Sequence, residues 1–235
     1  MNKNMMLDHA AKIKSNLIPY VTDDGSMSFR NIAVDEMYHT KSGALEESFE
    51  KHAKPLKVWE KINPIIYDVC FGLGYNAAAA IDVIRDNGNR SLITVYCFEN
   101  DKEIMEKILE IDANFKCYGI MRIFINNFLS QKNDYYEDTF DDVRFIMLFG
   151  DAREKMKEAK DNADFVFFDP FSPTHHPEMW ETDFMKSIYD KMNHGSKLST
   201  YSYARKTREN LVAAGFNVTA GPIIGRYGPS TIAIK

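Results

Sequence analysis

The sequence predicts an α/β protein built on a doubly wound, mostly parallel β-sheet with an antiparallel last strand. From residue 64 onward, short apolar segments alternate with segments that have the composition and periodicity of helices. The apolar segments lack the alternation of a sheet with one wet face, so helices are expected to bury both faces. Residues 216–235 have the pattern of a closing hairpin, which supplies the antiparallel strand.

The expected elements follow one another in regular order. The strands are expected at 65–71, 92–99, 143–149, 164–169 and 197–202, and the helices at 75–86, 101–112, 152–159, 182–192 and 204–214. The stretch 113–142 is partly helical, ends in an acidic run and is too long for a simple connection. We expect it to be an insertion over the functional site or a mobile lid.

Residues 1–60 are expected to form a small extension of hairpin and helix ahead of the main domain at 61–235. A short helix at the start precedes two strand-like segments, 19–22 and 27–34, which flank the turn sequence Asp-Asp-Gly-Ser. A helix is predicted over 43–53, with Ser42 as a possible N-cap because a serine hydroxyl can accept a bond from the first free N–H groups.

The composition is that of a globular protein, with 235 residues of which 45% are hydrophobic. The chain has no apolar run near the roughly 20 residues that span a bilayer, so no membrane partner is expected. Its first residues lack the apolar segment that a secretory signal peptide requires. The three cysteines form no Cys-x-x-Cys pair, which favours reduced core thiols and a cytoplasmic protein.

A glycine turn follows the first strand of the main domain, in Asp68-Val-Cys70-Phe-Gly72-Leu-Gly74. Gly72 permits a tight turn, Gly74 lets the backbone approach a ligand, and the next helix offers free N–H groups at its N-terminus. The bare motif is weak, but its place between a strand and a helix is the one that nucleotide binding requires.

Acidic residues stand at the ends of the following strands. Glu99 ends the second strand, where an acid accepts hydrogen bonds from a ribose diol, while Asp101 is better explained as a helix cap. Asp151 and Asp169 end the third and fourth strands. Because the carboxyl ends of parallel strands meet at one edge, these acids are expected to converge on one adenosine-containing cofactor.

Asp68-x-Cys70-x-Gly72-x-Gly74 resembles the glycine motif of class I S-adenosylmethionine-dependent methyltransferases, with Cys70 in place of the first glycine. Gly150-Asp151 resembles their adenine-contacting acid, and Asp169-Pro170-Phe171 the segment of members that methylate amino groups. The resemblance implies a Rossmann-like sheet and S-adenosylmethionine as cofactor, with no metal and no flavin.

Three spaced segments, 35–47, 168–180 and 200–216, resemble the methyltransferase domain of the tRNA 5-methylaminomethyl-2-thiouridine biosynthesis family. Asp35-x-x-Tyr38 and Gly43-Ala-Leu45-Glu46-Glu47 carry the first, and the second runs from Phe168-Asp169 to Trp180. The sequence departs from the family pattern at three places: Pro170 replaces a small residue, His176 replaces asparagine, and the run at Arg226 is less basic. The flavin oxidase half of the bifunctional enzymes is absent, which leaves methyl transfer only.

This resemblance implies that the protein methylates the 5-aminomethyl group of wobble uridine in tRNA. Asp169 would orient the amine, and the cofactor would be held by Tyr38, Asp68, Gly72, Gly74, Glu99 and Asp151. Phe171 and Trp180 would stack on a nucleobase and His176 would contact the substrate. Residues 191–235 carry seven Lys or Arg against Glu209 alone, so Arg205 and Arg208 are the candidates for tRNA phosphates.

Three alternatives stay open at the level of sequence. A polyamine aminopropyltransferase shares the fold, a Tyr-His segment and the strand-end acids, but it normally has a second acid just after the residue equivalent to Asp169. A non-catalytic nucleotide- or RNA-binding module would leave the acids unexplained. His175 and His176 could bind a metal, but no third ligand stands at a matching spacing. The oligomeric state is left open.

Overall fold

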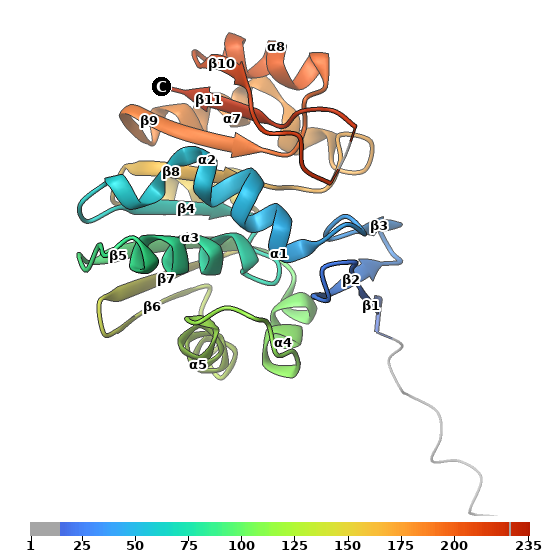
Figure 1. Cartoon of the computed structure of the whole chain (residues 1–235), viewed down its shortest axis with the longest axis vertical. Coiled ribbons are helices and arrows are strands. Elements are labelled where there is room, and N and C mark those ends of the chain that lie inside the picture. Colours follow the sequence, from blue (N-terminus) through green and yellow to red (C-terminus); the bar gives the residue numbers. More distant parts are fainter. Residues whose placement is uncertain (1–14, 226) are drawn as a thin grey trace, which may run out of the picture.

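The structure is a computed structural model that describes residues 15–225 and 227–235 (Figure 1). Within these residues the central sheet has the strands β4 (Ile65–Val69), β5 (Ile93–Glu99), β6 (Tyr135–Phe140), β7 (Val143–Phe149), β8 (Ala163–Phe168), β9 (Met192–Thr200), β10 (Asn217–Ala220) and β11 (Thr231–Ile234). Their order is β10-β11-β9-β8-β4-β5-β7-β6. The five inner strands from β9 to β7 are parallel, and β11 is antiparallel to β9. The predicted fold class is confirmed.

Helices bury both faces of the sheet, as the unbroken apolar strands predicted. Successive strand residues alternate between two cores: Ile66 packs into one and Tyr67 into the other. The first core holds residues of α2 (Lys54–Leu56), α3 (Tyr75–Asp86), α4 (Lys102–Glu110) and α5 (Tyr118–Leu129). The second holds residues of α6 (Ala152–Lys155), α7 (Thr182–Asp190), α8 (Arg205–Ala213) and the short helices η3 (Met156–Glu158) and η4 (Pro177–Trp180).

A second, small antiparallel sheet stands beside the carboxyl ends of the central strands (Figure 1). It contains β1 (Leu17–Val21), β2 (Met27–Asn31) and β3 (Glu36–Met37). The pairing of β1 with β2 confirms the predicted hairpin. The helix expected at the very start of the chain lies outside the described residues.

The helix predicted at 43–53 is present in a different form. It consists of α1 (Ala44–Glu46), the π-helix η1 (Glu47–Ala53) and α2, which the short η2 (Val58–Glu60) follows. Ser42 is not its N-cap: the Ser42 hydroxyl pairs with Thr40 at 2.8 Å, and Gly43 occupies the cap position. Asp24 of the hairpin accepts the Glu46 N–H instead, at 3.0 Å. The capping carboxylate therefore comes from another element.

The stretch 113–142 is not a lid. Its helix α5 packs against α4 and contributes Met121 and Phe124 to the first core. Its acidic end forms β6, which pairs antiparallel with β7 at the edge of the sheet. None of the residues in this stretch, all of which the structure describes, lines the pocket at the strand ends. The acidic side chains protect an exposed sheet edge from pairing with another chain.

Candidate active site

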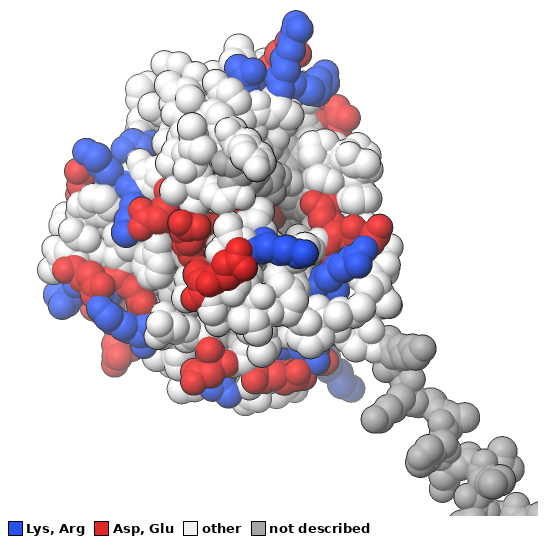
Figure 2. Space-filling view, turned by 45° about the vertical axis from the view of Figure 1, so that its right-hand side comes forward, with Lys and Arg blue, Asp and Glu red and all other residues white. Residues whose placement is uncertain are grey.

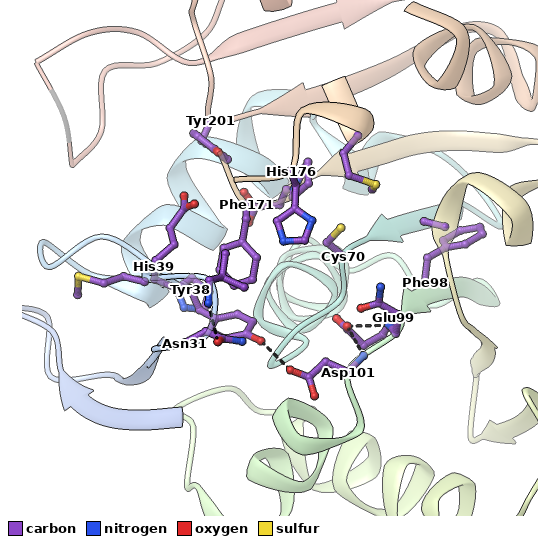
Figure 3. Close-up of a pocket in the computed structure, with 18 of the residues that line it drawn as sticks. Asn31, Tyr38, His39, Cys70, Phe98, Glu99, Asp101, Phe171, His176 and Tyr201 are labelled. Carbon is purple, nitrogen blue, oxygen red and sulfur yellow. Dashed lines mark hydrogen bonds between the residues drawn. The ribbon is translucent and has the colours of Figure 1, made fainter. Parts of the chain in front are cut away.

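A pocket of about 650 Å³ opens at the carboxyl ends of β4, β5, β7 and β8 (Figure 3). The small N-terminal sheet and η1 supply one wall through residues such as Tyr38, His39 and His52, and the loop after β8 supplies another. The strand-end acids Glu99, Asp151 and Asp169 all line it. The expected convergence at one edge of the sheet is thus present in the fold.

The glycine turn joins β4 to α3 through left-handed backbone. Cys70, Gly72 and Gly74 have φ of 68°, 53° and 71°. A Cβ at Gly74 would lie 2.5 Å from the Met121 sulfur and 2.6 Å from the Phe71 ring, so only glycine fits there. Below the turn, buried Asp68 accepts the Ala77 N–H at 3.0 Å through Oδ2. This carboxyl group therefore ties the strand to the first turn of the helix.

Glu99 braces the same turn from the neighbouring strand. Its Oε2 accepts the Gly72 N–H at 2.7 Å, and its Oε1 accepts the N–H groups of Asn100 and Asp101 at 2.8 and 2.9 Å. Burial raises the pKa of Glu99, and these three hydrogen bonds oppose that shift. Asp101 caps α4 by accepting the Glu103 N–H at 2.8 Å, as expected.

Tyr38 and Asp151 stand on two further sides of the pocket. The Tyr38 hydroxyl lies 3.3 Å from Asp101 Oδ2, and its ring meets Phe171 edge-on at 4.9 Å (Figure 3). Asp151 caps α6 by accepting the Arg153 N–H at 2.9 Å. The Arg153 guanidinium bonds the same carboxylate and lowers the pKa of Asp151. Both residues are thus fixed by neighbours before any ligand binds.

Asp169 follows β8 and forms the inner wall of the pocket. Its Oδ2 accepts a bond from Asn76 Nδ2 at 3.0 Å and lies 3.9 Å from His52 Nε2. Asp68 is its buried neighbour, and Asp68 Oδ1 has no hydrogen-bond partner among the described residues. Burial, with a further contribution from the charge of Asp169, raises the pKa of Asp68 well above its usual value. Burial therefore favours the neutral form of Asp68.

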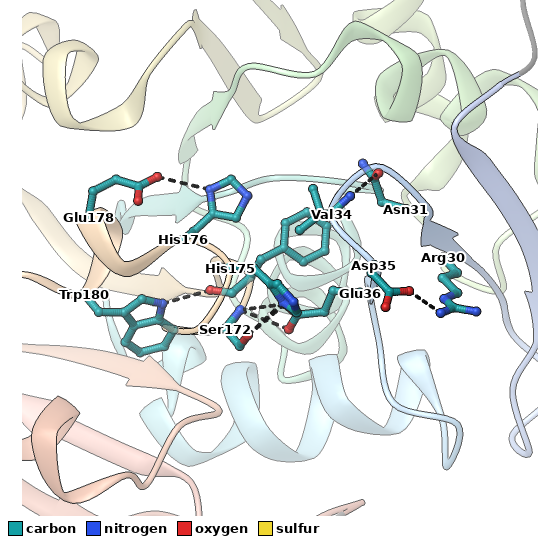
Figure 4. Close-up of polar contacts among 11 residues, drawn as sticks. Arg30, Asn31, Val34, Asp35, Glu36, Ser172, His175, His176, Glu178 and Trp180 are labelled. Atoms are coloured by element: carbon teal, nitrogen blue, oxygen red, sulfur yellow. Dashed lines mark hydrogen bonds and ion pairs between the residues drawn. The ribbon is translucent and has the colours of Figure 1, made fainter.

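The loop after β8 is pinned to the small sheet (Figure 4). Glu36 accepts the Ser172 N–H at 3.0 Å and the Ser172 hydroxyl at 2.9 Å, and it pairs with His175 Nδ1 at 2.6 Å. His176 lines the pocket, with its ring 5.6 Å from that of Phe171 and its Nδ1 3.2 Å from Glu178. His175 is therefore a structural partner of Glu36. The described residues contain no group of three or more His, Cys, Asp or Glu side chains arranged to hold a metal ion.

Three of the predicted substrate contacts, Trp180, Arg205 and Arg208, lie outside the pocket. Trp180 is only 3% exposed, packs edge-on against Phe168 and Tyr201, and donates its indole N–H to the Phe171 carbonyl at 2.8 Å. The prediction that it stacks on a nucleobase is wrong, because its ring is buried under the loop. Arg205 and Arg208 lie on α8 in a separate groove, where Arg205 pairs with Glu209 and Arg208 stacks over the Tyr203 ring at 4.2 Å.

Several pocket residues escaped the sequence analysis. The most prominent are His39, Glu47 and His52 of the N-terminal segment, and Asn76 stands next to the pocket, where it bonds Asp169. Asn76 had a signal, since it is a polar residue beside the glycine turn in a run of alanines. His52 had none, because its partner Ser199 is 147 positions away.

The pocket is strongly acidic. Among the described residues, its walls contain eight carboxylate residues and the single arginine Arg153; the carboxylates are Asp35, Glu36, Glu47, Glu99, Asp101, Asp151, Asp169 and Glu178. Figure 2 shows acidic side chains gathered across the middle of this face, with some basic side chains next to them and others at the margins. Such a site favours cationic ligands, such as a sulfonium or an amine.

The strand order, the glycine turn and the strand-end acids define a methyltransferase of the doubly wound class. A family described as S-adenosyl-L-methionine-dependent methyltransferase matches residues 116–235, and the chain belongs to this family. MnmC2 from Aquifex aeolicus has a similar structure, with a TM-score of 0.75 and 29% identity over 95% of this chain and 72% of that one. The predicted resemblance is confirmed.

Two curated relatives extend the comparison. An uncharacterized protein of Methanocaldococcus jannaschii is 32% identical over 95% of this chain and 61% of its own length. The tRNA 5-methylaminomethyl-2-thiouridine biosynthesis bifunctional protein MnmC of Leptospira interrogans is 25% identical over 82% of this chain and 31% of its own length. The chain thus spans less than two thirds of either relative.

A spermidine synthase solved with a transition-state analogue shares the fold alone, at a TM-score of 0.56 and 11% identity. Within the described residues, no helix is both long and apolar enough to cross a bilayer.

Proposed function

We propose that the protein transfers a methyl group from S-adenosylmethionine to the 5-aminomethyl group of wobble uridine in tRNA. The observation that carries this proposal is the position of Asp169 at the inner wall of an acidic pocket, directly beside the glycine turn. The choice of tRNA is supported by the MnmC relatives, which are named for the biosynthesis of 5-methylaminomethyl-2-thiouridine in tRNA.

The pocket fits this cofactor on the chemistry of its own residues. The turn at Gly72 adjoins Cys70, which lines the pocket, and the N-terminus of α3 follows it. The space beside Gly74 is filled by Met121 and Phe71, so Gly74 serves the packing of the turn and does not face a ligand as predicted. Asp68 Oδ1 is buried below the turn without a hydrogen-bond partner among the described residues, so a polar group of a ligand that reaches it can complete its hydrogen bonding. We propose that Tyr38, Glu99 and Asp151 hold the adenosine moiety.

When bound, S-adenosylmethionine supplies a methyl group on a cationic sulfonium. The pocket residues align the amine with that group, because in-line displacement depends on proximity and orientation. A primary alkyl amine has a pKa of about 10 by analogy with lysine and reacts only when neutral. The Asp169 carboxylate accepts an N–H bond from the amine, directs its lone pair and stabilises the ammonium that forms.

The test is methyl transfer by the purified protein to tRNA that carries 5-aminomethyluridine. Mass spectrometry of the digested nucleosides is expected to show 5-methylaminomethyluridine only when S-adenosylmethionine is present. A parallel reaction supplies decarboxylated S-adenosylmethionine and putrescine. Aminopropyl transfer there, without methylation of the tRNA, would identify an aminopropyltransferase and refute the proposal.

We further propose that α8 contacts tRNA phosphates. Replacement of Arg205, Lys206 and Arg208 by alanine is expected to weaken tRNA binding at every salt concentration. It should also lower the slope of log affinity against log salt by about 3, because each of the three lost phosphate contacts means about one counterion fewer released on binding. Binding of S-adenosylmethionine should not change, because these three residues, all of which the structure describes, lie outside the pocket.

The matched control removes the same kind of charge elsewhere, with Lys132→Ala and Lys157→Ala, two exposed lysines away from both grooves. Equal salt slopes for the α8 variant and this control would mean that Arg205 and Arg208 are solvent-exposed helix residues that do not contact tRNA.

A further inference from the structure

His52 is a buried histidine that faces the pocket from the π-helix η1. Only 1% of its surface is exposed, yet it lines the cavity together with Asp169. Its Nδ1 lies 2.9 Å from the Ser199 hydroxyl on β9, and its Nε2 lies 3.9 Å from Asp169 Oδ2. Segments that are distant in the sequence thus meet at one imidazole ring.

The hydrogen bond to Ser199 determines which ring nitrogen carries the proton. The Ser199 hydroxyl is fully buried, and His52 Nδ1 is its one hydrogen-bond partner among the described residues. A buried hydroxyl donates its proton where it has an acceptor, so Nδ1 accepts and the ring proton is on Nε2. That N–H points toward the carboxylate of Asp169.

The surroundings keep this ring neutral. Burial lowers the pKa of His52, with Lys51 acting in the same direction, while Asp169 and Glu47 oppose the shift. Lys51 and Glu47 form an ion pair on the same helix, and His39 is a further titratable neighbour. The neighbouring charges largely offset one another, so the desolvation of the ring decides its state.

We propose that His52 is a positioning residue for the methyl transfer, and this inference rests on the proposed function. His52 Nε2–H and Asn76 Nδ2 approach the same oxygen of Asp169, at 3.9 and 3.0 Å. The second oxygen of Asp169 is left for the substrate amine. Contraction of the His52 contact on substrate binding would hold the carboxylate in the orientation that the reaction needs.

The reaction balances without any proton transfer to or from His52. The amine nitrogen forms its bond to the methyl carbon as the carbon–sulfur bond breaks, and the bonding pair goes to sulfur. The positive charge moves from sulfur to the nitrogen, which keeps both its protons beside Asp169. His52 contributes a donor to the carboxylate, and a negative charge held by donors on one side stabilises the new ammonium on the other.

The helix type supports a functional role for this residue. A π-helix is rare and occurs mostly as short segments at functional sites. In η1 it turns Glu47, Ser48, Lys51 and His52 toward the interior together.

The test compares His52→Gln, which keeps an N–H donor near the position of Nε2, with His52→Leu, which keeps the volume but not the donor. Under single-turnover conditions we expect His52→Gln to retain a rate within about threefold of the native protein and His52→Leu to lose about thirtyfold. The KM for tRNA should stay nearly constant.

His194→Gln serves as the matched control, because His194 is exposed at the opposite end of β9. Equal losses in His52→Gln and His52→Leu would mean a purely structural role and would overturn the proposal. Nitrogen-15 NMR of the imidazoles in the native protein provides a readout that does not depend on substrate. A neutral His52 ring with its proton on Nε2 supports the proposal, and a proton on Nδ1 overturns it, even if the tRNA assay shows that the substrate was wrongly chosen.

Discussion

Asp169→Asn is expected to slow methyl transfer by about a hundredfold or more while the affinity for S-adenosylmethionine stays nearly unchanged. The asparagine side chain keeps the shape of the wall and an oxygen that can accept the bond from Asn76. It loses the negative charge that stabilises the forming ammonium. Single-turnover rates and isothermal titration measure the two quantities separately. Raising the pH should recover part of the rate, because a larger fraction of an amine with a pKa of about 10 is then neutral.

Asp183→Asn is the control for this substitution, since Asp183 is an exposed aspartate at the start of α7. A near-native single-turnover rate in Asp169→Asn on 5-aminomethyluridine tRNA would remove Asp169 from the mechanism. A comparable loss of cofactor affinity would instead assign it to the cofactor site.

Glu99→Ala is expected to weaken binding of S-adenosylmethionine by about a hundredfold. The substitution removes the proposed acceptor for the ribose hydroxyls. It also leaves the N–H groups of Gly72, Asn100 and Asp101 without the carboxylate that they share, so the glycine turn loses its brace. Isothermal titration with S-adenosylmethionine and with its demethylated product gives the affinity, and denaturant unfolding shows how much of the loss comes from a less stable fold.

Glu106→Ala removes an exposed glutamate from the adjoining helix α4 and should bind the cofactor normally. An unchanged affinity in Glu99→Ala, or tighter binding of NAD than of S-adenosylmethionine by the native protein, would refute the assigned cofactor site.

The sheet and the acidic edge were predictable because their signals are local. The strands β4, β5, β7 and β8 are mostly apolar, and a glycine or an acid stands at or shortly after the end of each: Gly72, Glu99, Asp151 and Asp169. The positions of Glu99, Asp151 and Asp169 at one edge then follow from parallel pairing alone. No contact between distant segments has to be guessed.

The errors concern residues whose role depends on distant partners. Trp180 is of a residue type that often stacks on bases, but it is buried because Phe168 and Tyr201 pack against it. The cap predicted at Ser42 is replaced by Asp24, which reaches the helix only once the hairpin has folded over it. The acidic run at 134–142 has the length of a lid, but strand pairing with β7 makes it an edge.

The N-terminal wall of the pocket has a consequence for how substrate choice can diverge within the family. More than half of the residues that line the pocket precede residue 116, where the family match begins. The matched half supplies Asp151, Asp169 and Phe171, whereas Tyr38, His39 and His52 come from the segment outside it. Two proteins can therefore share the family signature and still present differently shaped pockets. Differences in substrate specificity between such proteins should therefore be sought first in residues 31–52, which lie outside the region that the family model matches.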